Sequence, residues 1–293
     1  MDDPARGIDT AIRVGTCSWT DPALVSSGWY PSGSRDAEGR LRFYATRFPV
    51  VESDSAYYAL PSARNSRLWV ERTPPGFTFD IKAFAPFTGH SVAVRALPAD
   101  LRPAGPPGRR LRAGDLPADV MDELWRRFDE GIAPLRAAGR LGCVLFQFPP
   151  WYAPSAEAPD RILRCAEAIR APIAVEVRHP GWYAPEPLVS LTDFLARHHI
   201  PFVGVDAPGL LPAVRATSPE LSVVRFHGRS PHWGHGSKED RYRHTYERRE
   251  LEEWVPRIRV LAKESASVHV LFNNCCADAS VQAAQAMSEL LAA

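Results

Sequence analysis

Short apolar runs recur along this chain, and the segments between them place apolar residues at helical spacing. Runs of five or six residues rich in β-branched and aromatic side chains are typical of buried strands. Strands that alternate with helical segments predict a parallel sheet with helical crossovers. The expected strands are residues 12–16, 50–54, 77–82, 142–147, 172–177, 201–206, 221–227 and 268–272.

The expected helices are residues 39–48, 62–72, 117–138, 160–170, 186–198, 249–263 and 278–291. These eight strands and seven helices, interpreted as eight strand–helix units in 293 residues, predict an α/β fold, a (β/α)8 TIM-type barrel. We expect residues 1–293 to form a single domain with a core of about residues 12–291. A doubly wound open sheet is the alternative, but it usually has a glycine-rich phosphate turn after an early strand, and here that turn is GTCSW.

Two segments are longer than ordinary connections between elements. Residues 84–118, rich in Pro, Gly and Arg, are expected to form an insertion after the third strand. Residues 228–248 are expected to form a long loop after the seventh strand. Long loops in compact domains are commonly functional, which makes both segments candidates for binding.

Seven of the eight runs end on a charged or amide residue. Alternate side chains of a strand face opposite sides, so Ala174, Glu176 and Arg178 should share one face, as should Arg225 and His227. Around a closed barrel, the last residues of the strands would form a polar ring at the mouth where such barrels carry their chemistry. The residues that end these runs are Glu52, Lys82, Gln147, Glu176, Asp206, Arg225 and Asn273.

Burying an unpaired ion inside a barrel costs several kcal/mol, so the charged side chains of the ring must either pair with one another or remain in contact with water. Three acids of the ring can offset three bases, which leaves two interpretations open. The ring is either a preformed polar pocket or a closed network that plugs the barrel in a noncatalytic scaffold. The acids are Glu52, Glu176 and Asp206, and the bases are Lys82, Arg178 and Arg225.

The ring residues have the chemistry of a ligand site. Glu176 and Glu52 are candidate general acids or bases, and Asp206 is the third candidate catalytic carboxylate. Lys82 and Arg225 are expected to bind an anion or a developing negative charge. The other candidate ligand-binding residues are amides, further charged groups and aromatic walls, namely Trp19, Asp54, Tyr57, Tyr58, Gln147, Arg178, His179, Trp182, His227, Asn273 and Asn274.

A small polar ligand with an anionic group, such as a phosphorylated sugar or a nucleotide fragment, fits this ring best. A hydrolase or an isomerase would be the expected class of enzyme, although the residues leave open whether the protein is an enzyme at all. Several ring residues are of metal-ligating type, but three cations on the same ring compete for the carboxylates, so no metal is expected. No Walker loop is present, and no cofactor is expected.

Composition limits the partners. Lys and Arg total 35 against 34 for Asp and Glu, which gives no support for wholesale nucleic-acid binding. The loop 228–248, however, interleaves Arg229, Arg241 and Arg243 with aromatic residues, so a nucleic-acid-binding protein is the alternative. No apolar stretch approaches the ~20 residues of a membrane helix, so no membrane partner is expected. An odd number of cysteines, five, and a polar N-terminus without a secretion signal predict a cytoplasmic protein.

The chain contains the motifs GTCSW (15–19), VESDSAYY (51–58), FQFPP (146–150), VEVRHPGW (175–182), RFHG (225–228) and FNN (272–274). Together these six motifs resemble the YecE-like family, a bacterial and archaeal group known as a domain of unknown function. The resemblance implies a TIM-type barrel and no established reaction. Some barrels of that family look similar to endonuclease IV-like and xylose isomerase-like barrels, which is an analogy of fold only. Asp54 stands where the family usually has Asn, which would make the pocket more acidic.

Overall fold

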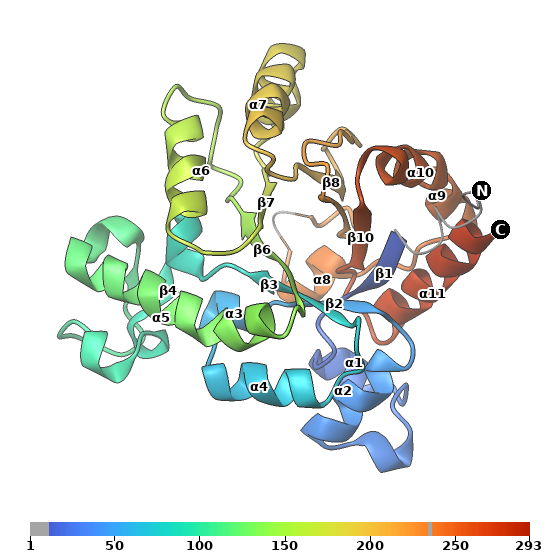
Figure 1. Cartoon of the computed structure of the whole chain (residues 1–293), viewed down its shortest axis with the longest axis horizontal. Helices are drawn as coiled ribbons and strands as arrows, with labels where there is room; N and C mark the ends of the chain where they lie inside the picture. The colour runs from blue at the N-terminus through green and yellow to red at the C-terminus, as the bar shows by residue number, and fades with distance from the viewer. Residues whose placement is uncertain (1–11, 234–235) are drawn as a thin grey trace, which may run out of the picture. The chain divides into compact units, whose positions relative to one another are not determined.

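The structure, a computed structural model, describes residues 12–233 and 236–293. All eight expected strands are confirmed, with ends that differ from the expected ones by at most two residues. They alternate with helices along the chain (Figure 1), and the expected fold class, an α/β fold of (β/α)8 TIM type, is confirmed. The strands are β1 (Ile12–Cys17), β2 (Val50–Ser53), β3 (Thr78–Lys82), β6 (Leu141–Gln147), β7 (Ile173–Glu176), β8 (Val203–Asp206), β9 (Leu221–Phe226) and β10 (Ser267–Phe272).

The expected helices are also present, and one of them is divided. The region predicted as a single helix over 249–263 forms two helices that meet at Glu253 and Trp254, because Pro256 at the start of the second lacks a backbone N–H and clashes with a preceding turn. The longer helices are α2 (Ala37–Ala45), α4 (Ala63–Glu71), α5 (Ala118–Ala137), α6 (Ala158–Glu167), α7 (Pro185–Arg197), α10 (Val255–Glu264) and α11 (Ala279–Ala292). Short helices are α1 (Pro22–Ser26), α3 (Ser55–Tyr58), α8 (Lys238–Tyr242) and α9 (Arg248–Glu252).

The expectation of eight strand–helix units is wrong at β8. Residues 207–220, all of them described, contain no helix and lead irregularly to β9. Pro208, Gly209 and Pro212 disfavour a helix in this segment. The segment instead packs on β8, where a Cβ at Gly204 would lie 3.0 Å from the Val214 side chain.

Contacts divide the chain into two compact units, which we describe separately. The described residues of the first unit are 12–52 and 180–293, apart from 234–235, and the second unit is 53–179. In the first unit the parallel strands pair in the order β2-β1-β10-β9-β8. In the second they pair in the order β3-β6-β7. The single domain expected over 1–293 stays a prediction.

Aromatic and β-branched side chains form the core of the first unit. Phe226 and Phe272 are paired in register on β9 and β10, and their rings stack at 4.5 Å. Helix α11 packs against β1 and β10 (Figure 1). A Cβ at Gly15 would lie 2.0 Å from the carbonyl oxygen of Val50, so the glycine of the GTCSW motif permits the close approach of β1 and β2.

The insertion at 84–118 belongs to the second unit, and two of its arginines donate hydrogen bonds within it. It contains short 3-10 turns and a two-stranded antiparallel sheet of β4 (Val92–Ala93) and β5 (Arg110–Leu111), and it leads into α5 as expected. Arg102 Nε donates to the Leu97 carbonyl at 2.8 Å, and Arg110 Nε donates to Ser91 Oγ at 2.8 Å. These arginines therefore support the local backbone. Across the described residues, no helix combines the length and the apolar character that a bilayer crossing requires.

Candidate functional site

The polar residues at the strand ends of the first unit form a closed ion pair. Arg225 Nε and Nη2 donate to Glu52 Oε2 and Oε1, each at 2.8 Å, and both residues have 0% exposure. Arg225 Nη2 also lies 3.6 Å from Cys17 Sγ at the end of β1. Burial, followed by the Glu52 charge, raises the pKa of the Cys17 thiol well above its usual value, so this thiol is not a nucleophile at neutral pH. The bidentate geometry satisfies two buried charges at once.

The pair continues to His227 and Asn273. Arg225 Nη1 lies 3.3 Å from His227 Nε2, and Asn273 Nδ2 lies 3.0 Å from His227 Nδ1. A guanidinium only donates, so Nε2 is the acceptor in the contact with Arg225. The strand ends of β2, β9 and β10 thus share one hydrogen-bonded chain.

The loop after β9 covers His227. The rings of Trp233 and Tyr242 lie 5.1 Å and 6.4 Å from the His227 ring. The loop turns at Gly228, which has φ +86°, and a Cβ there would lie 2.8 Å from the Cβ of His244. This positive φ and the close contact explain the glycine of the RFHG motif.

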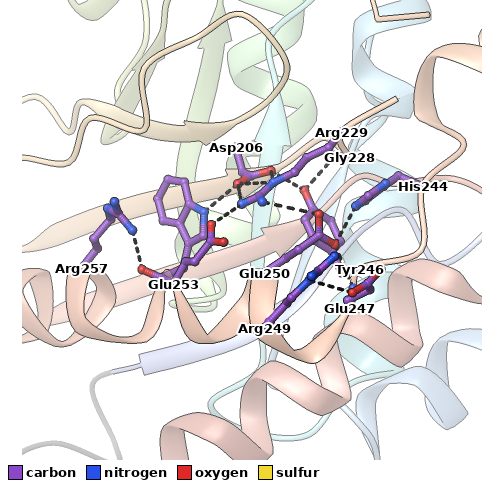
Figure 2. A network of polar contacts seen from close by, with 11 residues as sticks. Asp206, Gly228, Arg229, His244, Tyr246, Glu247, Arg249, Glu250, Glu253 and Arg257 are labelled. Carbon is purple, nitrogen blue, oxygen red and sulfur yellow. Dashed lines mark hydrogen bonds and ion pairs between the residues drawn. The ribbon is translucent and has the colours of Figure 1, made fainter. Parts of the chain in front are cut away.

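Asp206 at the end of β8 anchors the same loop (Figure 2). Its carboxylate accepts hydrogen bonds from Trp254 Nε1 at 2.6 Å, Tyr246 Oη at 2.9 Å and Arg229 Nη2 at 2.9 Å. Burial and the Asp206 charge raise the pKa of Tyr246, so its hydroxyl stays protonated and donates. Arg229 also lies 2.9 Å from Glu253 and is therefore a structural residue of the expected basic loop. This network favours an anchoring role for Asp206, and its predicted catalytic role stays untested.

In the second unit, three neighbouring strands bring polar residues together at their C-terminal ends. Glu176 of β7 is in register with Gln147 of β6, and Lys82 of β3 is in register with Leu145 of β6. Glu176 has 0% exposure and accepts a hydrogen bond from Arg178 Nε at 2.6 Å. The Arg178 side chain remains 11% exposed. The buried Oε1 of Gln147 has no hydrogen-bond partner among the described residues.

His90 lies in the insertion after β3, and the charges of Lys82, Arg178 and Glu176 affect its pKa. It is 9% exposed, and its Nδ1 lies 2.8 Å from Thr88 Oγ1. Burial, followed by the positive charges of Lys82, Arg178 and Arg161, lowers the pKa of His90 to about 4, although Glu176 opposes the shift. The imidazole is therefore neutral at pH 7. Arg161 lies against the same turn, since a Cβ at Gly89 would be 2.6 Å from its Nη2.

Aromatic rings surround His90 and Lys82. Lys82 Nζ lies 4.6 Å from the centre of the Tyr57 ring, and Tyr57 meets His90 edge-on at 5.3 Å. Tyr58 meets Tyr57 at 5.0 Å, and Trp151 meets His90 at 5.6 Å. Tyr57 and Tyr58 lie on α3, immediately after β2. Cationic and aromatic side chains are thus interleaved within one unit.

The family model described as "Protein of unknown function DUF72" matches residues 13–293. This chain belongs to the DUF72 family. The UPF0759 protein YunF of Bacillus subtilis (strain 168) is 30% identical over 292 residues, which cover 96% of this chain and 94% of YunF. The expected membership of a family of unknown function is confirmed, and the names of that family are DUF72 and UPF0759. The name YecE-like, expected from the sequence motifs, does not occur among them.

Two solved DUF72 structures share the fold of this DUF72 protein. A protein from Thermotoga maritima MSB8 has a TM-score of 0.77 and 27% identity, with coverage of 97% of this chain and 100% of its own. A protein from Enterococcus faecalis V583 has a TM-score of 0.75 and 22% identity, with coverage of 97% and 98%. These similarities establish the fold and leave the chemistry of the site to the residues themselves.

The remaining predicted site residues of the DUF72 chain differ in accessibility. Trp19 and Trp182, predicted as walls, are 6% and 5% exposed, whereas Tyr58 is 56% exposed. Asn274 is buried and donates through Nδ2 to the His244 carbonyl at 3.0 Å. Asp54 and His179 are half-buried. Their roles in binding stay predictions.

Three residues near the predicted ones were not expected from the sequence, namely His90, Trp151 and Arg161. His90 follows the buried Phe84 and Phe87, and this apolar start to the insertion was the signal that the segment folds back into the protein. Trp151 directly follows the FQFPP motif. Nothing in the sequence around Arg161 distinguishes it from other helix-surface arginines. Among the described residues, no group of three or more His, Cys, Asp and Glu is arranged to hold a metal ion.

Proposed function

We propose that this DUF72 protein binds a small polar anionic ligand, a phosphorylated sugar or a nucleotide fragment, at the C-terminal ends of β3, β6 and β7. The binding side chains are Lys82, Arg178 and Arg161, which we name the cation group. The observation that supports this most directly is the arrangement around His90. Lys82 Nζ lies 4.6 Å from the centre of the Tyr57 ring, which meets the His90 ring at 5.3 Å, and Arg161 lies against the turn at Gly89. Burial, followed by the positive charges of the cation group, also lowers the pKa of His90 to about 4, against the opposing charge of Glu176. Partial burial strengthens the attraction of such charges for an anion.

Gln147 supports a ligand with hydroxyl groups. Its buried Oε1 lacks a hydrogen-bond partner among the described residues, and an unsatisfied buried acceptor costs about 1–3 kcal/mol. A sugar hydroxyl could donate to this oxygen after a small movement of the side chain. A sugar phosphate would then use both kinds of group, the phosphate on the cation group and a hydroxyl on the amide.

Lys82 offers a sharp test because the chain has three lysines, and Lys263 is an exposed one on α10. We expect Lys82→Gln to lower the affinity for ribose 5-phosphate by at least about tenfold, since a hydrogen bond to a charged group contributes about 1.5–3 kcal/mol. Lys263→Gln makes the same chemical change and should leave the affinity unchanged. Isothermal titration calorimetry at low ionic strength measures both.

Two results would contradict the proposal. One is equal affinity in the two lysine variants. The other is the failure of ribose 5-phosphate, AMP and inorganic phosphate all to bind the unmodified protein at low ionic strength, where surface charges are least screened. The second result would favour a noncatalytic scaffold, for which the closed Glu52–Arg225 pair is the supporting observation.

A further inference from the structure

Trp151 stands out among the eight tryptophans, all of which lie in the described residues. It is 63% exposed, and it is the one tryptophan in the exposed class. An exposed indole adjacent to a group of cations is a feature of surfaces that stack the bases of nucleic acids or nucleotides. A single exposed apolar residue is common on proteins, so the surroundings of Trp151 decide its meaning.

The backbone that carries Trp151 is held firmly although the side chain is exposed. Pro149 and Pro150 precede it and fix their own φ angles. The rings of Phe148 and Tyr152 stack at 4.3 Å with an interplanar angle of 18°. Tyr152 Oη donates to the Ala158 carbonyl at 3.0 Å. The indole therefore projects from a rigid turn, as a preorganised stacking surface does.

A continuous series of side chains connects this indole with the cation group. Trp151 meets His90 at 5.6 Å, His90 meets Tyr57 at 5.3 Å, and Tyr57 lies 4.6 Å from Lys82 Nζ. A ligand that used both ends would need a charged end and a flat apolar end separated by several atoms. A phosphorylated sugar has the first of these and lacks the second.

We propose that the ligand is a nucleotide unit whose phosphate lies on the cation group and whose base stacks on Trp151. This inference rests on the proposed anion-binding function and adds the aromatic part of the ligand. The unit could belong to a mononucleotide or to the end of a single strand, because both present a phosphate and a base. The neutral state of His90 suits a contact with an uncharged base or sugar.

The experiment compares two ligands and two substitutions by calorimetry. AMP and ribose 5-phosphate share a phosphorylated ribose and differ in the base. We expect AMP to bind about 5- to 150-fold more tightly than ribose 5-phosphate, the range that stacking of one base contributes. Trp151→Leu should remove this difference by weakening AMP alone, and Trp151→Phe should retain most of it.

The outcomes separate this inference from the function on which it rests. Equal affinity for AMP and ribose 5-phosphate, unchanged in Trp151→Leu, would overturn the nucleotide assignment and leave the anion site intact. Failure of both ligands to bind would overturn the two proposals together.

A short single-stranded oligonucleotide distinguishes a nucleic-acid strand from a free nucleotide as the source of the nucleotide unit. Tighter binding than AMP, with a steeper dependence on salt, would indicate a strand, and weaker binding would indicate a free nucleotide. Because Trp151 is exposed, the Tm of its variants should match that of the unmodified protein.

Discussion

Two glutamate–arginine pairs lie at strand ends of this protein, and they differ in the geometry of the pairing and in the exposure of the arginine. In the first unit, Arg225 donates hydrogen bonds to both carboxylate oxygens of Glu52, and both residues are fully buried. In the second unit, Arg178 donates through Nε to one oxygen of Glu176 and remains 11% exposed. Lys82 and Arg161 add positive charge at His90 in the second unit. We name the fully buried Glu52–Arg225 pair the brace. The Glu176–Arg178 pair lies near His90, where the charges of Lys82 and Arg161 also act.

The comparison indicates that polar residues at the strand ends can have different roles within one protein. Some form structural ion pairs, and others are candidates for ligand binding. Burying a fully paired couple of ions adds little net stability, but it makes each partner dependent on the other. A group of neighbouring cations attracts an anion from outside the protein. Asp206, saturated by Trp254, Tyr246 and Arg229, resembles the brace more than the site.

The largest effect is expected at the brace. Arg225→Ala should lower the free energy of unfolding by about 3–5 kcal/mol, because it leaves the Glu52 charge buried and unpaired. Urea denaturation measures the loss. The double substitution Arg225→Met with Glu52→Leu removes both charges and should recover most of the stability. An unchanged Tm for Arg225→Ala would show that water reaches Glu52 and would end the distinction between the two pairs.

His90 should give the second unit a pH dependence that the brace lacks. Its pKa is lowered from 6.5 to about 4 in the folded protein, so between these values the unfolded chain binds more protons. Its contribution is fully present above about pH 6.5 and is lost as the pH falls toward 4. Between pH 7 and 5 the loss amounts to about 2 kcal/mol. Unfolding of the unmodified protein and of His90→Gln at both pH values measures this difference. If the two proteins lost stability in parallel, the pKa of His90 would not be lowered in the folded protein.

The strands and the strand-end residues could be predicted because both depend on local sequence. A buried parallel strand has a short apolar run, and the residue that ends it, such as Glu52 or Glu176, is visible in the letters alone. The partners could not be predicted in the same way. Arg229, rather than a residue of the ring, pairs with Asp206, because the loop after β9 folds back over β8. His90 acts at a site formed by residues up to 88 positions away, a proximity that only the tertiary fold creates.

The smallest and most discriminating effect concerns Glu176. Lys82 and Arg178 attract a ligand anion, and the Glu176 carboxylate repels it, so Glu176→Gln should strengthen the binding of ribose 5-phosphate. At an effective dielectric constant of about 20, removal of one charge at a few ångströms is worth on the order of 1 kcal/mol after screening, or about fivefold in affinity. The same substitution at the brace, Glu52→Gln, should leave the affinity unchanged and instead lower the Tm.

If Glu176 is also the acid–base group of a hydrolase or isomerase, the tighter-binding Glu176→Gln variant should have no turnover. Weaker ligand binding in Glu176→Gln would mean that the carboxylate contacts the ligand directly, as an acceptor for its hydroxyl groups, and the second pair would then be a part of the binding surface rather than a competitor for it.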